Sequence, residues 1–457
     1  MDTQQLVKQL VQILKMNFYN FLKLFFKLSL LLTLTGTYMS ANSLPKYYSK
    51  KLDNGLEIVA IPMNNGTNVI TTDIFYKVGS RNEVMGKSGI AHMLEHLNFK
   101  STKNLKAGEF DEIVKGFGGV NNAATSFDYT YYYVKSSSKN LDKSLELYSE
   151  LMQNLTLTDE EFQPERDVVA EERRWRTDNN PMGYLQFRLF NNIYTYHPYH
   201  WTPIGFMDDI QNWTIEDIKD FHSTYYQAKN AIVVVAGDIS KEEVFESATK
   251  HFKNIKNSKE IPNKIHTIEP KQDGEKRATI YKDSQVEMIA MAYHIPNFEH
   301  KDQIALSALS HLLSSGKSSI LQKKLVDETR LANSVYGYNM ELKDPGVFTF
   351  LAVANENIDA LKIEKEILDI IAKIQAGNIE KSDLEKVKIN TKADFIYSLE
   401  SSSDVASIFG TYLVRDNIEP LLNYEKDLEE LKVEDIVEVA KKYLVKENST
   451  TIILKKQ

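Results

Sequence analysis

Three residues in the stretch "AHMLEHLNFK", residues 91–100, have the types and the spacing of a metal site. His92 and His96 are four residues apart, so on a helix both side chains lie on one face and can reach one ion. Glu95 sits beside them, and the spacing suits zinc. The same side chains could instead be the polar residues of an ordinary amphipathic helix. A third ligand is needed to decide between these interpretations.

Candidates for the third ligand occur in the stretch "ERDVVAEERRW". Glu165 and Glu172 are seven residues apart, so on a helix they share a face and lie roughly 10 Å apart along its axis. Only one of them can easily bind the same ion, and the other would support it. Acidic helix faces are usually just solvated, so the spacing alone leaves the choice open. The chain has no cysteine, and any metal must therefore be held by His, Asp or Glu.

Alternating helices and strands are expected to position these side chains. Apolar residues at helical spacing predict one buried side for the helix that carries the histidines: Ile90, Met93, Leu94 and Leu97. A second helix is predicted to start at Thr158, because Glu161 follows at capping-box spacing, and Pro164 could divide that helix into two pieces.

The stretch "GGVNNAATSFDYTYYY" is predicted to bind an extended peptide at a sheet edge. Larger residues alternate there with smaller or polar ones, which suits an exposed strand to which a peptide adds as another strand: Thr125, Phe127, Tyr129 and Tyr131. The alternative is an ordinary core sheet with a tight turn at Gly118 and Gly119.

The composition indicates a globular protein that does not bind nucleic acid. Hydrophobic residues make up 42% of the 457 residues, and the net charge is −8, with no basic patch to neutralise phosphates. The N-terminus differs, because four lysines before residue 28 precede the apolar stretch "LSLLLTLTGTYMSA". That pattern predicts a signal peptide over residues 1–43 and export to the periplasm or the outer face of the membrane. Met16 is an alternative start, and an uncleaved anchor is the alternative to cleavage.

The rest of the chain contains an internal repeat. Residues 214–235 align without a gap with residues 432–453, at an offset of 218, and the identical pairs are Glu216 and Glu434, Asp217 and Asp435, Ile218 and Ile436, Tyr225 and Tyr443, and Asn230 and Asn448. A polar, lysine-rich linker is predicted over residues 253–277. It separates an N-terminal zinc-binding domain, residues 44–252, from a homologous non-catalytic domain, residues 278–457.

Four motifs of the chain, taken in order, resemble those of the pitrilysin-type zinc peptidases: "GIAHMLEHLNFKST", "GGVNNAATSFDYTYYY", "ERDVVAEERR" and "HPYH". This M16 or inverted-zincin family includes mitochondrial processing peptidase and insulysin, and the resemblance spans both halves. It implies an α+β fold of two homologous domains, each a mainly antiparallel sheet with helices packed on one face. Together the two domains would form half of a clam-like chamber.

The resemblance also implies the roles of individual residues. His92, His96 and Glu172 would bind Zn²⁺, since Glu172 lies 76 residues after His96, as the family's third ligand does, and takes that role ahead of Glu171. Glu95 would act on a zinc-activated water, and Glu165 would be the supporting glutamate.

Two further residues and an activity follow from the same resemblance. Asn122 and Ala123 would lie where the edge strand meets the substrate. The implied activity is a zinc-dependent endopeptidase acting on peptides or unfolded polypeptides. The alternative is a non-catalytic scaffold or peptide-binding subunit, because some relatives serve as structural core subunits of respiratory complexes.

A departure from the family pattern concerns the second half. Family members often carry there an arginine and a tyrosine, seven residues apart, that hold the substrate and its oxyanion. In "KLVDETRLANSVYGY" these positions are Val326 and Asn333, while Arg330 and Tyr336 are near by but would not face the same way. We therefore expect a hetero-oligomer with a related subunit that carries the pair, with a homodimer as the alternative.

Two other motifs are not expected to bind ligands. "SSGKSS" near Gly316 is not a phosphate loop, because His311 stands where the first glycine is required. "HPYH", from His197 to His200, contains a proline that favours a turn over a second metal site. The repeat offset places Ser310, Leu313, Ser314 and Asn390 opposite the site residues of the first half, so no second metal site is expected.

Overall fold

The computed structural model describes residues 43–262, 265 and 267–457. The predicted signal peptide therefore lies outside the described residues except for Ser43. Residues Leu44–Gln457 form one compact unit. Within the described part of the chain, no helix is both long enough and apolar enough to cross a membrane.

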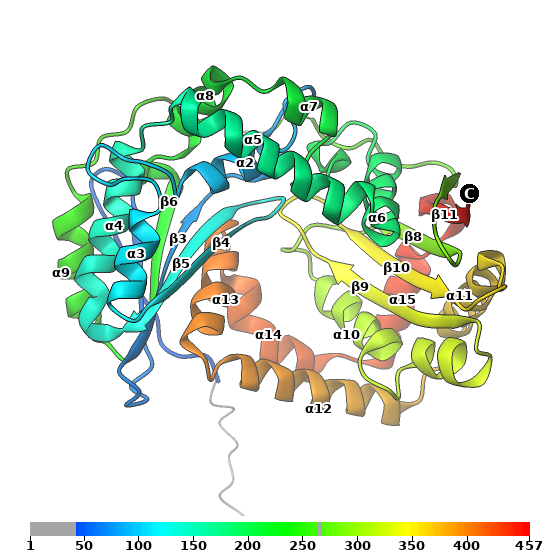
Figure 1. The fold of residues 1–457 in the computed structure, drawn as a ribbon. Helices are drawn as coiled ribbons and strands as arrows, with labels where there is room; N and C mark the ends of the chain where they lie inside the picture. The colour runs from blue at the N-terminus through cyan, green and yellow to red at the C-terminus, as the bar shows by residue number, and fades with distance from the viewer. Residues whose placement is uncertain (1–42, 263–264, 266) are drawn as a thin grey trace, which may run out of the picture. The chain divides into compact units, whose positions relative to one another are not determined.

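The first half of the chain builds a six-stranded, mainly antiparallel sheet. Its strands lie in the spatial order β1 (Tyr48–Lys51), β2 (Glu57–Pro62), β6 (Ala231–Gly237), β3 (Val69–Tyr76), β5 (Thr130–Ser137) and β4 (Val120–Thr125). Only β2 and β6 run parallel. Strand β4 pairs with β5 alone, so it forms one edge of the sheet (Figure 1).

In the described residues of this half, eight α-helices accompany the sheet: α2 (Ile90–Leu97), α3 (Glu109–Gly116), α4 (Leu141–Asn154), α5 (Asp159–Arg173), α6 (Pro181–Ile193), α7 (Met207–Asn212), α8 (Ile215–Tyr225) and α9 (Lys241–Phe252). The predicted apolar side of α2 is confirmed, because its four apolar residues are all at most 2% exposed. Helix α5 is unbroken at Pro164, contrary to the expected division. Pro164 has no N–H group, so only the carbonyl oxygen of Glu160 loses its helical hydrogen bond. Glu160 lies in the first turn of α5 and is exposed to solvent.

The second half repeats this arrangement with five strands. Their spatial order is β7 (Lys276–Lys282), β11 (Ser449–Lys456), β8 (Met288–His294), β10 (Val347–Ala354) and β9 (Ala332–Met340). The helices that follow in sequence are α10 (Gln303–Ser314), α11 (Ala360–Gln375), α12 (Lys381–Ser398), α13 (Ser402–Val414), α14 (Glu419–Glu430) and α15 (Val433–Tyr443). The predicted α+β fold with two mainly antiparallel sheets is confirmed.

Each sheet has a second covered face that the sequence did not predict. Helix α13, from the second half, lies on the first sheet, where Val405 and Phe409 join a buried cluster with Phe75 of β3. Helix α6, from the first half, lies on the second sheet, where Leu189 joins a cluster with Ala290 of β8. The two halves thus exchange one helix each, which explains why all seven residues of β6 are buried.

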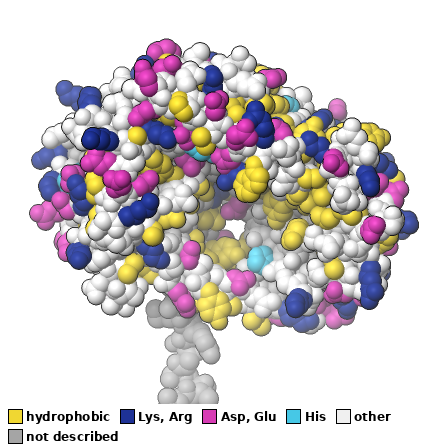
Figure 2. Space-filling view, viewed as in Figure 1, with side chains coloured by type: hydrophobic (Ala, Val, Ile, Leu, Met, Phe, Trp, Pro, Cys, Tyr) yellow, Lys and Arg dark blue, Asp and Glu magenta, His cyan; other side chains and the backbone are white. Residues whose placement is uncertain are grey.

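The face of this unit shown in Figure 2 is hollowed in the middle, between the elements of the two halves. Hydrophobic side chains are exposed inside the hollow, although the rim is rich in charged residues. Exposed apolar surface enclosed by a charged rim is typical of a surface that receives a ligand.

Gly410 is predicted to be essential for the docking of α13. A Cβ at this position would lie 2.0 Å from Cε2 of Phe75, a fully buried ring that stacks on Tyr131 at 5.1 Å and cannot move aside. We expect Gly410→Ala to lower the free energy of unfolding by about 1–3 kcal/mol or more, measured by urea denaturation. Gly116→Ala is the control, because nothing lies within 4 Å of its Cβ, and it should be neutral or stabilising. Equal stability of both variants would contradict this account of the helix exchange.

Candidate metal centre

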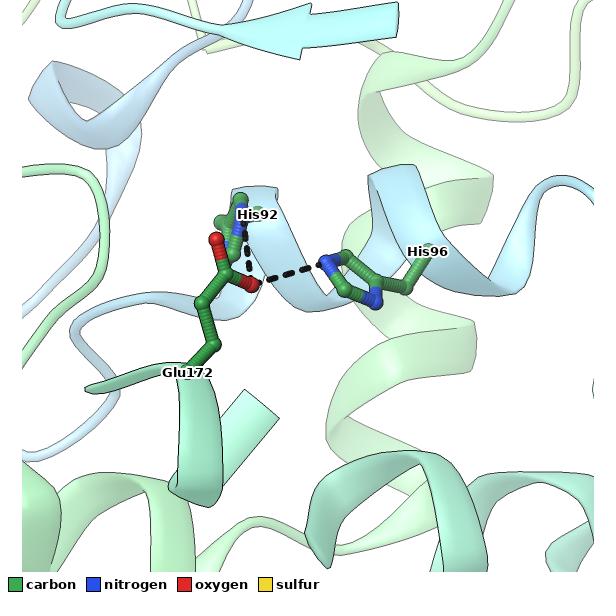
Figure 3. A group of neighbouring side chains, drawn as sticks. All are labelled: His92, His96 and Glu172. Carbon is green, nitrogen blue, oxygen red and sulfur yellow. Dashed lines mark ion pairs between the residues drawn. The ribbon is translucent and has the colours of Figure 1, made fainter. Parts of the chain in front are cut away.

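Three side chains from two helices converge at one point. His92 and His96 project from the same face of α2, and Glu172 reaches them from the end of α5 (Figure 3). Oε2 of Glu172 lies 3.7 Å from Nε2 of His92 and 3.3 Å from Nε2 of His96. Among the described residues, this is the one group of His, Asp or Glu side chains arranged to hold a metal ion.

The donor atoms fit a tetrahedral metal. Bonds of 2.0–2.2 Å to nitrogen and oxygen place tetrahedral ligands about 3.3–3.6 Å apart. The two measured separations from Glu172 are close to this spacing, and all three donor atoms lie within 4.8 Å of one another. Two imidazoles and one carboxylate also form a donor set that catalytic zinc sites use. The residues present therefore fit a zinc ion with one position left open.

Glu165 fixes the orientation of His96. Its Oε1 lies 2.8 Å from Nδ1 of His96, and its Oε2 lies 2.6 Å from Nζ of Lys100. The hydrogen bond from His96, added to the charge of Lys100, lowers the pKa of Glu165 to about 2. An ionised Glu165 accepts a hydrogen bond from Nδ1–H of His96. Nε2 is therefore the ring nitrogen of His96 that faces Glu172. Glu165 thus contacts His96 without joining the group of three side chains.

Burial affects the two histidines differently. Burial lowers the pKa of His92 to about 4, and its Nδ1 has no hydrogen-bond partner among the residues that the structure describes. Burial also acts to lower the pKa of His96, but hydrogen bonds to Glu165 and Glu172 outweigh it and raise that pKa to about 9. His92 is therefore held in the neutral form that binds metals, while His96 is held beside two carboxylates.

Glu172 is positioned by an arginine that the sequence analysis missed. Nε of Arg176 donates to Oε1 of Glu172 at 2.8 Å, one helical turn further along the chain, so Oε2 is left to face the histidines. Glu171, the rival candidate, is paired with Arg174 and its side chain is 72% exposed. The structure therefore brings Glu172 to the histidines and turns Glu171 away from them.

Glu95 lies next to this group and contacts the edge strand. Thr125, the last residue of β4, donates a hydrogen bond of 2.5 Å to Oε2 of Glu95. Burial raises the pKa of Glu95, and the hydrogen bond from Thr125 partly opposes this shift. A carboxylate with a raised pKa is suited to take up a proton at neutral pH.

The predicted peptide-binding residues lie on strand β4. Asn122 is exposed and Ala123 is half-buried, because alternate residues of β4 face solvent and helix α2. The edge strand is confined to Val120–Thr125, however, and Tyr131 belongs to the interior strand β5. As an edge strand, β4 has backbone groups available for another strand.

A cavity of about 500 Å³ opens beside the candidate metal ligands. It extends from His92 and Thr125 to Trp175, Met182 and Ile204. Trp175 is 74% exposed although it is a large aromatic residue, and it lies just after α5, the helix that carries Glu172. Polar residues such as Arg176, Asn180 and Gln186 complete its lining. A cavity of this mixed kind beside a polar site is suited to receive one side chain of a substrate.

Glu83 holds the start of the metal-site helix and was also missed by the sequence analysis. Its buried carboxylate accepts hydrogen bonds from the backbone N–H groups of Gly89 and Ala91, both at 2.8 Å, and from Nε1 of Trp201 at 2.7 Å. Burial raises the pKa of Glu83 to about 8, while these three bonds act in the opposite direction. Ala91 precedes His92, so Glu83 fixes the backbone at the first ligand.

The "HPYH" motif has a structural role, as expected. Nε2 of His197 lies 2.9 Å from Oδ2 of Asp344, in the second half, and Nδ1 of His200 lies 2.6 Å from the carbonyl oxygen of Tyr194. Arg81 also binds Asp344, so the motif helps to join the two halves.

The fold and the site define a class of protein, and comparison with known proteins identifies it. Residues 58–200 match the insulinase or M16 peptidase family, and residues 212–391 match the M16 peptidase inactive domain. A relative from Helicobacter pylori, the zinc protease PqqE, is 58% identical over 93% of this chain and 97% of its own length. The chain therefore belongs to the M16 family of peptidases.

Two further comparisons agree with this assignment. A crystal structure of a protease from Helicobacter pylori has a TM-score of 0.89 and 58% identity, covering 90% of this chain and 100% of that chain. A probable mitochondrial-processing peptidase subunit beta from Arabidopsis thaliana is 27% identical over 81% of this chain and 71% of that protein. The resemblance inferred from the motifs is thus confirmed.

We predict that Glu83→Gln weakens both the fold and the metal site. The amide would direct an N–H group at backbone or indole N–H donors, and each donor left buried without an acceptor costs about 1–3 kcal/mol. The free energy of unfolding and the retention of zinc during dialysis against a weak chelator should both fall. Glu112→Gln is the matched control, because Glu112 lies exposed in the first turn of α3. A Glu83→Gln variant as stable and as rich in metal as the control would refute the role of Glu83.

Proposed function

We propose that this chain is a zinc-dependent endopeptidase that hydrolyses peptides or unfolded polypeptides in an extended conformation. The observation that carries the proposal is the convergence of His92, His96 and Glu172, with Glu95 and the end of an exposed edge strand beside them. The family membership and the zinc-protease names of its relatives support the same conclusion.

The proposed chemistry assigns the proton transfers to Glu95. A zinc ion held by His92, His96 and Glu172 would supply a water with a pKa lowered to about 7 and would polarise the peptide carbonyl. Glu95 accepts the proton of the attacking water, because its raised pKa favours the protonated form. It then donates that proton to the leaving amine. Thr125 holds Oε2 of Glu95, which leaves Oε1 for the exchange.

The substrate would bind along β4 as an additional strand. Asn122 and Ala123 lie on this strand, and its outer backbone groups would bond to the peptide whatever its side chains. The hydrogen bond between Thr125 and Glu95 supports this mode of binding, because it joins the end of the strand to the proposed base. The adjoining cavity, lined by Trp175 and Met182 together with polar residues, would take one substrate side chain next to the scissile bond.

We predict that Glu95→Gln abolishes hydrolysis and leaves one zinc ion bound per chain. The base is removed while the three ligands remain, so turnover of a peptide library should fall by at least about a hundredfold at unchanged zinc content. Glu171→Gln is the control, because Glu171 is exposed and bound to Arg174, and it should keep full activity. The zinc content of each variant would be measured by inductively coupled plasma mass spectrometry.

The same experiment separates the enzyme from its alternative. A non-catalytic scaffold or peptide-binding subunit would bind peptides without cleaving them. Wild-type turnover by Glu95→Gln, or zinc-loaded wild-type protein with no turnover in any subunit combination, would overturn the proposed mechanism.

We further propose that the active form is a hetero-oligomer with a related M16-like subunit. Val326 is partly buried against the core of the second half, and Asn333 is exposed on β9. Neither side chain can offer a cation or a phenol to a developing oxyanion. Arg330 lies in the turn before β9 at a φ of 53°, and Tyr336 is 56% exposed. The partner would supply the arginine and tyrosine pair, and a homodimer that uses Arg330 or Tyr336 is the alternative.

We also propose that the protein is exported to the periplasm or the outer face of the membrane. A lysine-bearing segment followed by an apolar stretch and small residues supports export, so the partner would be exported too.

We predict that the isolated chain has low activity and gains at least about tenfold on addition of its related subunit. The assay compares cleavage by the chain alone, by the chain mixed with the product of a neighbouring related gene, and by that product alone. The Glu95→Gln variant with the partner is the control and should stay inactive. Full activity of the chain alone would refute the two-subunit proposal. Loss of that activity in Arg330→Gln or Tyr336→Phe would then point to the homodimer.

A further inference from the structure

A cavity of about 370 Å³ occupies the second half, between helices α10, α11 and α12. At the repeat offset of 218, α10 and α12 overlap the positions of α2 and α5, the two helices that carry the candidate metal ligands. Asn390 corresponds to Glu172, and it lines this cavity. The cavity therefore lies on the counterpart of the metal-site helix pair.

Ser310 and Ser314, which correspond to His92 and His96, have a structural role. Oγ of Ser310 donates to the carbonyl oxygen of Gly337 on β9 at 3.0 Å, and Oγ of Ser314 accepts from the N–H of the same glycine. These two serines thus hold the strand against α10. With Asn390 they cannot replace two imidazoles and a carboxylate, so the cavity is not a second metal centre.

The charge of the cavity is positive. Four lysines line it, together with only two acidic residues. Lys324 lies 3.7 Å from Glu328, and Lys386 lies 3.5 Å from Asp383, so these two lysines have acidic partners. Lys323 and Lys373 have no acidic partner within 4 Å among the described residues. Two uncompensated ammonium groups facing one cavity favour an anion.

Two residues that line the cavity carry a buried polar atom without a hydrogen-bond partner in the described part of the chain. Ser319 is 5% exposed, and its Oγ is buried without a hydrogen bond in the described part of the chain. The same holds for Nδ1 of His311. Both residues line the cavity. A buried hydroxyl left unbonded costs about 1–3 kcal/mol, and rotation of the Ser319 side chain toward an acceptor in the cavity would recover it.

We propose that this cavity binds a small molecule carrying a phosphate monoester. Lysine ammonium groups and a serine hydroxyl are suitable donors to phosphate oxygens, and the volume leaves room for an organic group beside the phosphate. This is not a phosphate loop, because the lysines come from three separate segments rather than from one glycine-rich turn. The proposal is independent of the peptidase activity.

The test is calorimetric titration of the full chain with glucose 6-phosphate at constant ionic strength. We expect saturable binding of one molecule per chain, competition by inorganic phosphate, and no binding of glucose. Lys323→Gln combined with Lys373→Gln should weaken binding at least tenfold, because charged hydrogen bonds are lost, and Ser319→Ala should weaken it several-fold.

The control has the same change in net charge at exposed lysines away from the cavity, Lys362→Gln combined with Lys441→Gln. It should bind like the wild type, and circular dichroism would show that every variant is folded. Absence of saturable binding at millimolar concentrations, or equal weakening in both double variants, would overturn the proposal. Citrate binding as tight as that of glucose 6-phosphate would overturn the assignment to phosphate.

Discussion

The reciprocal docking of α6 and α13 is the constraint on which the candidate site depends. Glu172 stands at the end of α5, and the chain then passes through a wide π-type turn, Arg174–Asp178, and two asparagines into α6. Helix α6 is buried against the sheet of the other half. Gly183 meets the turn so closely that a Cβ there would lie 2.0 Å from the carbonyl oxygen of Arg176. The third ligand is thus anchored at one end by the second half of the molecule.

Charges around the candidate metal ligands are balanced in pairs. Glu165 and Glu172 are the acidic residues of α5 that contact the histidines. Lys100 binds the oxygen of Glu165 that does not face a histidine, and Arg176 does the same for Glu172. Burial acts to raise the pKa of Glu172, yet His96, His92 and Arg176 together lower it, so the carboxylate is ionised before any metal arrives. A site organised in advance loses little conformational entropy on binding its ion.

Much of this site was accessible from the sequence because its ligands are local patterns. The helical spacing of His92 and His96 predicts a shared face, and the choice of Glu172 over Glu171 needed only the family resemblance. The exchange of α6 and α13 was not predictable, since an apolar helix does not reveal which sheet it covers. Glu83 was missed for a similar reason. It caps α2 through a loop rather than from the N-cap position, which Gly89 occupies. The contact between Thr125 and Glu95 was not predictable either, because it depends on how β4 lies against α2.

The helix exchange also bears on how such a molecule can exist as a duplicated chain. A single copy of the repeated unit would leave one apolar face of its sheet bare and one apolar helix unsupported. Two separate copies could satisfy both needs only as a domain-swapped pair, whose stability would depend on concentration. Joining the copies through the segment between α9 and β7 makes that association intramolecular. One copy then becomes free to lose the metal ligands, because its sheet and helix are still required to complete the other.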